Sequence, residues 1–85
     1  MTMKEMTVEM AAGMDAHPAA MLVQVASRYD SSIYIENGAV KVNAKSIMGM
    51  MTLALGEGEH VKVTAEGADE ADAVARIEEY LKTGK

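Results

Sequence analysis

Apolar and polar residues alternate along four short stretches of the chain, and this alternation predicts half-buried β-strands. These stretches are residues 3–10, 33–36, 40–43 and 60–66. In the first stretch Met6, Val8 and Met10 share one face, which we expect to be the buried one. Asn37 and Gly38 separate the second stretch from the third, and because both tolerate positive φ they predict a tight hairpin.

Three other stretches combine a capping residue with apolar residues spaced along one helical face. The first helix begins near Asp15, a preferred N-cap, and has Pro18 in its first turn. Ser46 caps a short helix from residue 47 to about residue 53, and Ala68 or Asp69 opens the last helix. The buried stripes predicted for the first and last helices are Ala19, Leu22, Val23, Ala26 and Ala73, Val74, Ile77, Tyr80, Leu81.

The predicted order of elements, β-α-β-β-α-β-α, places the protein in the α+β class. This order suggests a sandwich in which helices cover one face of an antiparallel sheet and the other face meets solvent. Eighty-five residues predict a single domain over residues 1–85, because so short a chain has no room for a second core.

Composition excludes several functional classes. The chain has no cysteine, which rules out disulfides, thiolate metal sites and a cysteine nucleophile. A net charge of −5 disfavours direct binding to nucleic acid, and three tyrosines without Phe or Trp offer no stacking platform for bases. No apolar run approaches the roughly 18 residues of a membrane span, and no secretory segment is recognisable. We therefore expect a cytoplasmic protein without membrane insertion.

Ser46 is the strongest candidate for a regulated residue. As an N-cap its hydroxyl satisfies a helix amide, which is worth about 1 kcal/mol and is by itself a sufficient reason for a serine. The same hydroxyl can be phosphorylated, which adds about −1.5 to −2 charges where the helix dipole favours negative charge. Both interpretations remain open from the residues alone.

The short helix that follows this serine suggests a contact surface, because it cannot bury four large apolar side chains on one face. Met50 is expected to join the core with Leu53. Ile47, Met48 and Met51 then form an exposed patch of the kind that marks partner-binding sites. The alternative is that these three side chains are covered within a local core.

Asp15 and His17 form a second candidate region, at a helix start where free amides can hold an anion. An aspartate can form an acyl phosphate, although no second carboxylate lies close in sequence to help hold a metal. The simpler interpretation is an N-cap for Asp15 and a surface position for His17, and His60 receives no role. The acidic residues interpreted as a solvated face rather than a metal site include Glu59, Glu66, Asp69, Glu70, Asp72 and Glu78.

Three segments resemble the HPr family, the small phosphocarrier proteins of the bacterial sugar phosphotransferase system. They are residues 13–20 (GMDAHPAA), 42–49 (VNAKSIMG) and 65–70 (AEGADE). They are similar to the family's active-site segment, its regulatory-serine segment and its turn into the last helix. The resemblance covers nearly the whole chain. It implies an open-faced β-sandwich whose four antiparallel strands have the spatial order 1-4-2-3, with three helices on one face.

Two positions differ from the family pattern. Asp15 stands where the family has its phosphorylated histidine, and His17 stands where it has the arginine that steadies the phosphate. Loss of that histidine with retention of the serine segment is the pattern of Crh, the catabolite-repression variant of the family, and Ala54 fits the same variant. His17 can replace an arginine only in part, because it is a single-point donor.

The resemblance implies a regulatory protein that is not an enzyme and needs no cofactor or metal. HPr kinase/phosphorylase would phosphorylate Ser46, and the chain would then bind a CcpA-type transcriptional regulator as its co-repressor. The positions that match the family's partner-contacting surface are Ala20, Ile47, Met48 and Met51. The alternative is a phosphocarrier that uses His17 or Asp15 together with enzyme I and sugar-specific permease components.

Overall fold

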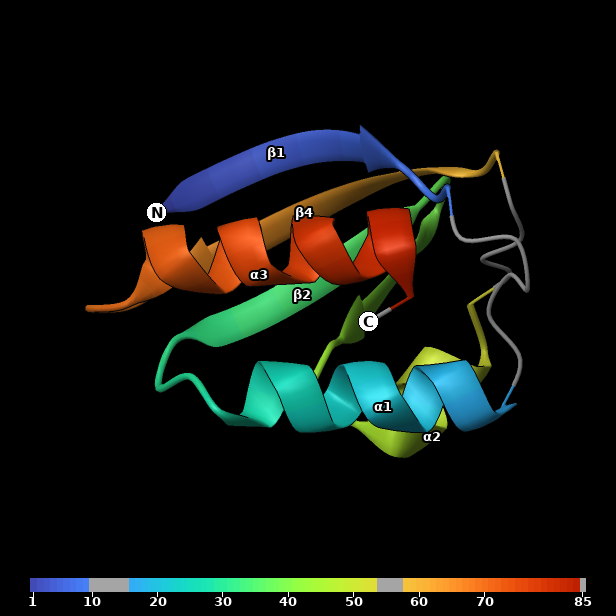
Figure 1. Ribbon diagram of the computed structural model, residues 1–85, viewed down its shortest axis with the longest axis horizontal. Coiled ribbons are helices and arrows are strands. Elements are labelled where there is room, and N and C mark those ends of the chain that lie inside the picture. The colour runs from blue at the N-terminus through green and yellow to red at the C-terminus, as the bar shows by residue number, and fades with distance from the viewer. Residues whose placement is uncertain (10–15, 54–57, 85) are drawn as a thin grey trace.

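A four-stranded antiparallel sheet forms one layer of the protein, and three helices pack on one of its faces (Figure 1). This computed structural model describes residues 1–9, 16–53 and 58–84, with the backbone alone for residues 16–19. The elements are β1 (Thr2–Thr7), α1 (Ala16–Ser27), β2 (Ser32–Asn37), β3 (Val40–Asn43), α2 (Ile47–Met51), β4 (His60–Glu66) and α3 (Glu70–Thr83). The strands lie in the order β1-β4-β2-β3, so the predicted α+β class, element order and sheet order are confirmed.

The strand register places apolar residues opposite one another on the helix side of the sheet. Met6 of β1 pairs with Val61 of β4, and Val63 of β4 pairs with Ile35 of β2. All four side chains are buried. Because side chains alternate between faces along a strand, this register leaves the charged neighbours of these residues on the open face.

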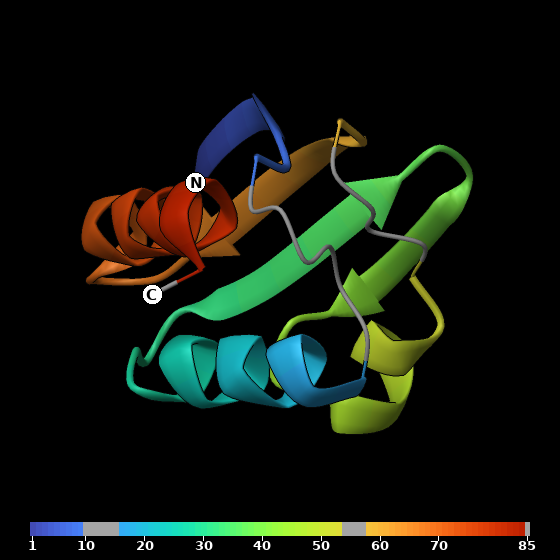
Figure 2. The same ribbon diagram turned by 45° about the vertical axis from the view of Figure 1, so that its right-hand side comes forward.

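Figure 2 shows two groups of helices on the covered face, with α3 beside β1 and β4 and with α1 and α2 packed side by side. The predicted α3 stripe is confirmed, since all five of its residues are buried. In α1, Leu22 and Ala26 are buried as predicted, Val23 is only partly buried against the core, and Val25 is buried although it was not predicted. The side chain of Ala19 lies outside the described part of the chain. Four of the five residues 22–26 are apolar, so the sequence pattern does not decide which valine is buried. That is decided by how α1 packs on its neighbours. No helix in the described ranges is long and apolar enough to cross a membrane.

Strand β1 ends at Thr7, which is earlier than the predicted end near residue 10. Val8 still bonds to the segment before β4: its amide donates to the Glu59 carbonyl at 2.9 Å, and its carbonyl accepts from the Gly58 amide at 2.8 Å. The backbone leaves the ladder at Glu9, whose amide donates to the Leu81 carbonyl at 2.9 Å. The chain therefore turns toward the end of α3, where Val8 is fully buried.

The hairpin between β2 and β3 lies one residue later than predicted. Asn37 remains in β2 and pairs with Val40, so the two loop residues are Gly38 and Ala39. Of these two loop residues, Gly38 has positive φ, at 61°, and Ala39 does not. A glycine with positive φ at the first loop position is the requirement of a type II′ turn, which needs no positive φ at its second position.

Candidate functional site

Ser46 lies at the start of α2, as predicted, in an extended conformation with φ −105° and ψ 113°. Its Oγ accepts a hydrogen bond from the Gly49 amide at 3.2 Å, and its carbonyl accepts one from the Met50 amide at 2.9 Å. Ser46 is half-buried. The predicted N-cap role is therefore confirmed, and the residue that carries the hydroxyl is not fully buried.

The loop that carries this serine is tied to the rest of the fold on both sides. The Asn43 side chain accepts from the Lys45 amide at 2.8 Å, and the Ala44 amide donates to the Ile33 carbonyl of β2 at 2.9 Å. The Lys45 ammonium group donates to the Tyr29 carbonyl, just after α1, at 2.7 Å. The N-terminal end of α2 is thus held between β2 and the end of α1.

Gly49 allows α2 to approach β3 closely. A Cβ atom at this position would lie 3.3 Å from the Val42 Cβ and 3.5 Å from the Ser46 Oγ. A glycine in a helix costs about 1 kcal/mol relative to alanine, and here the close packing offsets part of that cost. Helix α2 is also shorter than predicted: it ends at Met51, and the Thr52 hydroxyl donates to the Gly49 carbonyl at 2.6 Å.

The apolar side chains of α2 divide between the core and solvent as predicted. Met50 is 1% exposed, and Leu53, just beyond the helix, is also buried. On the other side Ile47 is 40% exposed, Met48 79% and Met51 57%. Met51 lies four residues after Ile47 and three after Met48, so on a helix it neighbours both side chains. The three side chains form an exposed apolar surface next to Ser46.

Helix α1, which packs against α2, carries two further residues that are not buried. Ala20, a predicted member, is half-buried, and Met21 is 41% exposed. Sequence analysis missed Met21, although its place just outside the predicted buried stripe was a signal that it would be exposed. Because α1 packs against α2, we group these residues as the recognition surface, which consists of Ala20, Met21, Ile47, Met48 and Met51.

The second predicted region is described only in part. Asp15 lies outside the described residues, and His17 is described by its backbone alone, in the first turn of α1. The roles considered for both therefore stay predictions.

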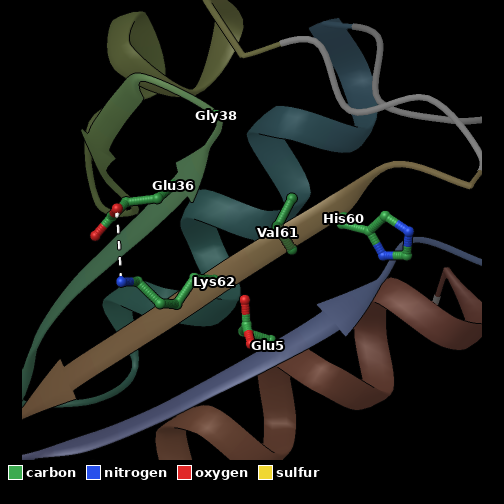
Figure 3. A pocket seen from close by; sticks show the side chains of 6 residues that line it. All are labelled: Glu5, Glu36, Gly38, His60, Val61 and Lys62. Carbon is green, nitrogen blue, oxygen red and sulfur yellow. Dashed lines mark ion pairs between the residues drawn. The ribbon is translucent and has the colours of Figure 1, made fainter.

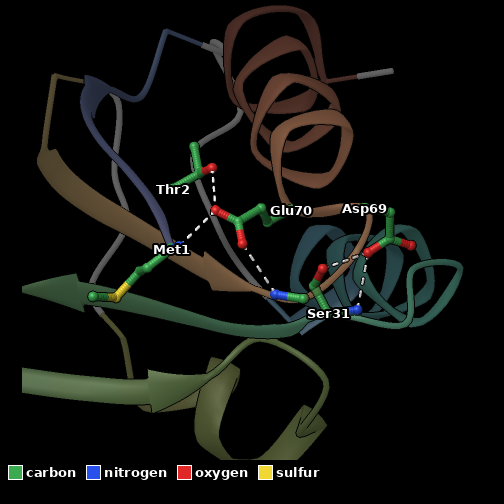
Figure 4. Close-up of polar contacts among 6 residues, drawn as sticks. Met1, Thr2, Ser31, Asp69 and Glu70 are labelled. Atoms are coloured by element: carbon green, nitrogen blue, oxygen red, sulfur yellow. Dashed lines mark hydrogen bonds and ion pairs between the residues drawn. The ribbon is translucent and has the colours of Figure 1, made fainter.

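A polar junction at the start of α3 was not predicted (Figure 4). The Asp69 carboxylate gives no side-chain cap to α3. It accepts instead from the Ser31 hydroxyl, from the Ser31 amide at 3.0 Å and from the Asp30 amide at 2.9 Å. These donors, led by the Ser31 hydroxyl, hold the pKa of Asp69 below its usual value. Asp69 was expected on a solvated acidic face, but it joins the loop after α1 to the start of α3.

Glu70, another member of the predicted acidic face, has a similar structural role. Its carboxylate pairs with the Met1 amino group at 2.8 Å, and accepts from the Thr2 hydroxyl at 2.6 Å and the Gly67 amide at 3.2 Å. These three donors, in that order, lower the pKa of Glu70 to about 2. The result is a link between β1 and α3 rather than a free surface charge.

A shallow hollow of about 300 Å³ lies on the open face of the sheet (Figure 3). Glu36 there faces Lys62 and Lys41, with 3.9 Å between the charged atoms of each pair. His60 Nδ1 lies 3.0 Å from the Thr7 hydroxyl oxygen. Glu36 and Lys62 are thus paired with each other, and no group of three acidic or histidine side chains in the described ranges could hold a metal ion. The hollow therefore lacks a clear chemical function, unlike the recognition surface beside Ser46.

Comparison with known proteins identifies the family. The family model described as the PTS HPr component phosphorylation site matches residues 2–83. The HPr-like protein Crh of Halalkalibacterium halodurans is 43% identical over 82 residues, which cover 96% of this chain and 98% of that protein. The crystal structure of HPr-C-His from Thermoanaerobacter tengcongensis has a TM-score of 0.91 at 40% identity, covering 100% of this chain and 98% of the other. The Bacillus subtilis catabolite repression containing protein Crh has a TM-score of 0.76 at 44% identity, covering 82% and 80%. The chain therefore belongs to the HPr family and is a Crh-like member of it.

Proposed function

We propose that this protein is an HPr-like regulator of bacterial carbon catabolite repression that is phosphorylated on Ser46 by HPr kinase/phosphorylase. The phosphorylated form then binds a CcpA-type transcriptional regulator as its co-repressor. In this proposal the protein acts in the cytoplasm as a single domain, residues 1–85, and has no catalytic activity of its own. The description of the Bacillus subtilis relative as a catabolite repression protein supports this role.

The observation that carries the proposal is that the Ser46 hydroxyl caps a five-residue helix, α2, whose outer face carries exposed apolar side chains. The hydroxyl oxygen accepts a hydrogen bond from the Gly49 amide at 3.2 Å, and Ser46 as a residue is half-buried. Met48 and Met51 project into solvent within five residues of it. A phosphate here would present a partner with a charge and an apolar contact together, which is a more selective combination than either alone.

The contacts around Ser46 lead us to expect that phosphorylation leaves the rest of the fold unchanged. The Lys45 ammonium group is engaged with the Tyr29 carbonyl, and the Asn43 side chain is engaged with the Lys45 amide. These bonds hold the loop without using the Ser46 hydroxyl. We therefore expect phosphorylation to change the charge of the recognition surface while the fold stays the same.

Phosphorylation is tested by incubating the full chain with purified HPr kinase/phosphorylase and ATP, and measuring intact mass. We expect one phosphate on the unaltered protein and none on Ser46→Ala. Ser46→Asn is a second test, because asparagine keeps an N-cap acceptor but cannot be phosphorylated by this route. Ser27→Ala, at the exposed end of α1, is the matched control and should be labelled normally. Equal labelling of Ser46→Ala would exclude this site.

Binding is tested by titrating the phosphorylated protein with the purified CcpA-type regulator. We expect Met48→Ser to raise Kd about tenfold, because an exposed apolar contact of the α2 surface becomes polar. Met3→Ser changes another exposed methionine, 52% exposed on β1, and is the control. If the two variants have the same Kd, the regulator does not bind at the α2 part of the recognition surface.

A phosphocarrier function is the second candidate, and the observation that favours it is the match to a phosphotransferase-system phosphorylation-site model. It predicts labelling from phosphoenolpyruvate by enzyme I, followed by transfer to a sugar-specific permease component. A phosphohistidine at His17 would be acid-labile, whereas an acyl phosphate at Asp15 would react with hydroxylamine. Absence of any label from phosphoenolpyruvate would exclude this candidate.

A further inference from the structure

The described methionines fall into two groups that differ in access to solvent. Met6 and Met50 belong to the hydrophobic core and are 8% and 1% exposed. Met21, Met48 and Met51 are exposed on α1 and α2, which pack side by side (Figure 2). Three accessible thioethers therefore lie on the recognition surface, while the methionine that anchors α2 is protected.

An exposed thioether reacts with two-electron oxidants such as peroxides, and the rate follows exposure. The sulfur lone pair attacks one peroxide oxygen, the O–O bond breaks and an S–O bond forms. The proton on the transferred oxygen passes to the departing hydroxide, which leaves as water. Sulfur loses two electrons and the peroxide gains them, so the products are a methionine sulfoxide and water. Thiol-dependent sulfoxide reductases reverse the change.

We propose that Met21, Met48 and Met51 are oxidation sites through which peroxides weaken partner binding by the Ser46-phosphorylated protein, without removing the phosphate. A sulfoxide converts an apolar, flexible side chain into a polar one, and Met-rich contact surfaces are sensitive to this change. This regulation rests on the proposed function, because it requires that the partner contacts this surface.

The position of Met50 lets the surface change without loss of the fold. Met50 is packed in the core with Leu53, and oxidation there would place a polar group in the core. Because the exposed methionines react first, peroxide is expected to alter the surface before it reaches the residue that holds α2. Binding should therefore be lost while the protein is still folded.

The first test is the site of oxidation. The full chain is treated with hydrogen peroxide, quenched with catalase and mapped by peptide mass spectrometry over time. We expect Met48 and Met51 to oxidise at least tenfold faster than Met50, with Met21 also faster. The exposed Met1 and Met3 serve as fast internal references. Oxidation of Met50 as fast as Met48, with an unchanged far-ultraviolet circular dichroism spectrum, would overturn the proposal.

The second test is binding of the Ser46-phosphorylated protein to the CcpA-type regulator, with the regulator never exposed to peroxide. We expect oxidation to raise Kd at least tenfold and the reductases to restore it. The triple variant M21L/M48L/M51L is compared with its own untreated sample, and that ratio of Kd values should stay near one. M1L/M3L is the matched control and should lose binding as the unaltered protein does.

The outcomes separate this inference from the function on which it rests. If the untreated phosphorylated protein binds and oxidation leaves Kd unchanged, the redox regulation is wrong and the proposed function stands. The redox regulation alone is also wrong if peroxide weakens binding of the triple variant as much as that of the unaltered protein. The same holds if the protein unfolds when binding is lost. If the untreated phosphorylated protein does not bind, both are wrong.

Discussion

Helix α2 and the start of α3 each follow a polar side chain that accepts hydrogen bonds, yet the two regions differ in how firmly that side chain is held. Ser46 accepts one bond from within its own short helix, at 3.2 Å. Asp69 accepts three bonds from a loop that lies 38 and 39 residues away in the chain. The first region leaves its polar atom and its apolar neighbours accessible, whereas the second uses its polar atoms to join distant segments.

This difference teaches where the molecule can change without unfolding. At the α3 junction the carboxylate, the Ser31 hydroxyl and the backbone satisfy one another, so a substitution leaves a buried partner unsatisfied. At α2 the outward side chains can be altered or modified at little cost to the fold, because Met50 alone anchors the helix from beneath. Regulation fits the second region and stability fits the first.

The largest effect is expected for Gly67→Ala, at the junction. A Cβ there would lie 2.7 Å from the Ser31 Cα and 2.6 Å from its Oγ, and Gly67 has φ 154°. We expect a loss of about 4 kcal/mol in the free energy of unfolding, since backbone strain and overpacking add. Urea denaturation measures it. Gly58→Ala, with φ 90° and nothing within 4 Å, should lose only about 1 kcal/mol from strain. Equal losses would show that the contact with Ser31 is unimportant.

Within α2, Met50→Ala and Met48→Ala compare how much the buried side and the exposed side of the helix contribute to the free energy of unfolding. Met50→Ala should lower the free energy of unfolding by about 3 kcal/mol, because it leaves a cavity in the core. Met48→Ala should change it by less than about 0.5 kcal/mol, because that side chain is in solvent. Thermal and urea unfolding of both variants check this. A large loss in the Met48 variant would show that the recognition surface is part of the core.

Ser46→Ala should lower the free energy of unfolding by about 1 kcal/mol through loss of the N-cap, and Ser46→Asn should recover most of it. The same two variants should both lack phosphate after kinase treatment. Denaturant unfolding and mass spectrometry together therefore separate the structural role of the hydroxyl from its chemical role. If Ser46→Asn is as unstable as Ser46→Ala, capping does not explain the serine.

The smallest expected effect is a change in how the stability of the protein depends on pH, caused by a substitution at the α3 junction. The Ser31 hydroxyl is the main reason that the pKa of Asp69 is lowered, so Ser31→Ala should raise that pKa toward its usual value. A lowered pKa in the folded state gives stability that is present above about pH 4, the usual range of an aspartate, and lost as pH falls through the folded pKa. The urea midpoints of the two proteins should thus differ at pH 6, and the difference should begin to shrink near pH 4 and vanish once pH is below the folded-state pKa of Asp69. If the difference in urea midpoint is the same at every pH, Ser31 acts through packing and not through the pKa of Asp69. Ser32→Ala, at an exposed neighbouring serine, is the control.

Much of the fold could be predicted because its signals are local. Ser46 caps α2 through a bond to a residue three positions later, and a capping residue before an apolar run predicts that bond. The buried stripe of α3 follows the helical period, with charged residues on the other side to set its direction. The exposure of Met48 and Met51 followed from the small area that a short helix can cover. In each case the residues that decide the outcome lie within a few positions of one another.

The sequence by itself thus determined the order of elements, the helix that carries Ser46 and the apolar surface beside it. Only the tertiary structure decided which valine of α1 is buried, where β1 ends and what Asp69 binds. Val23 and Val25 differ in burial because α1 packs against particular neighbours, and Asp69 leaves the α3 cap because the Ser31 loop supplies three donors. These outcomes depend on segments far apart in the chain, and no local pattern records which distant groups will meet.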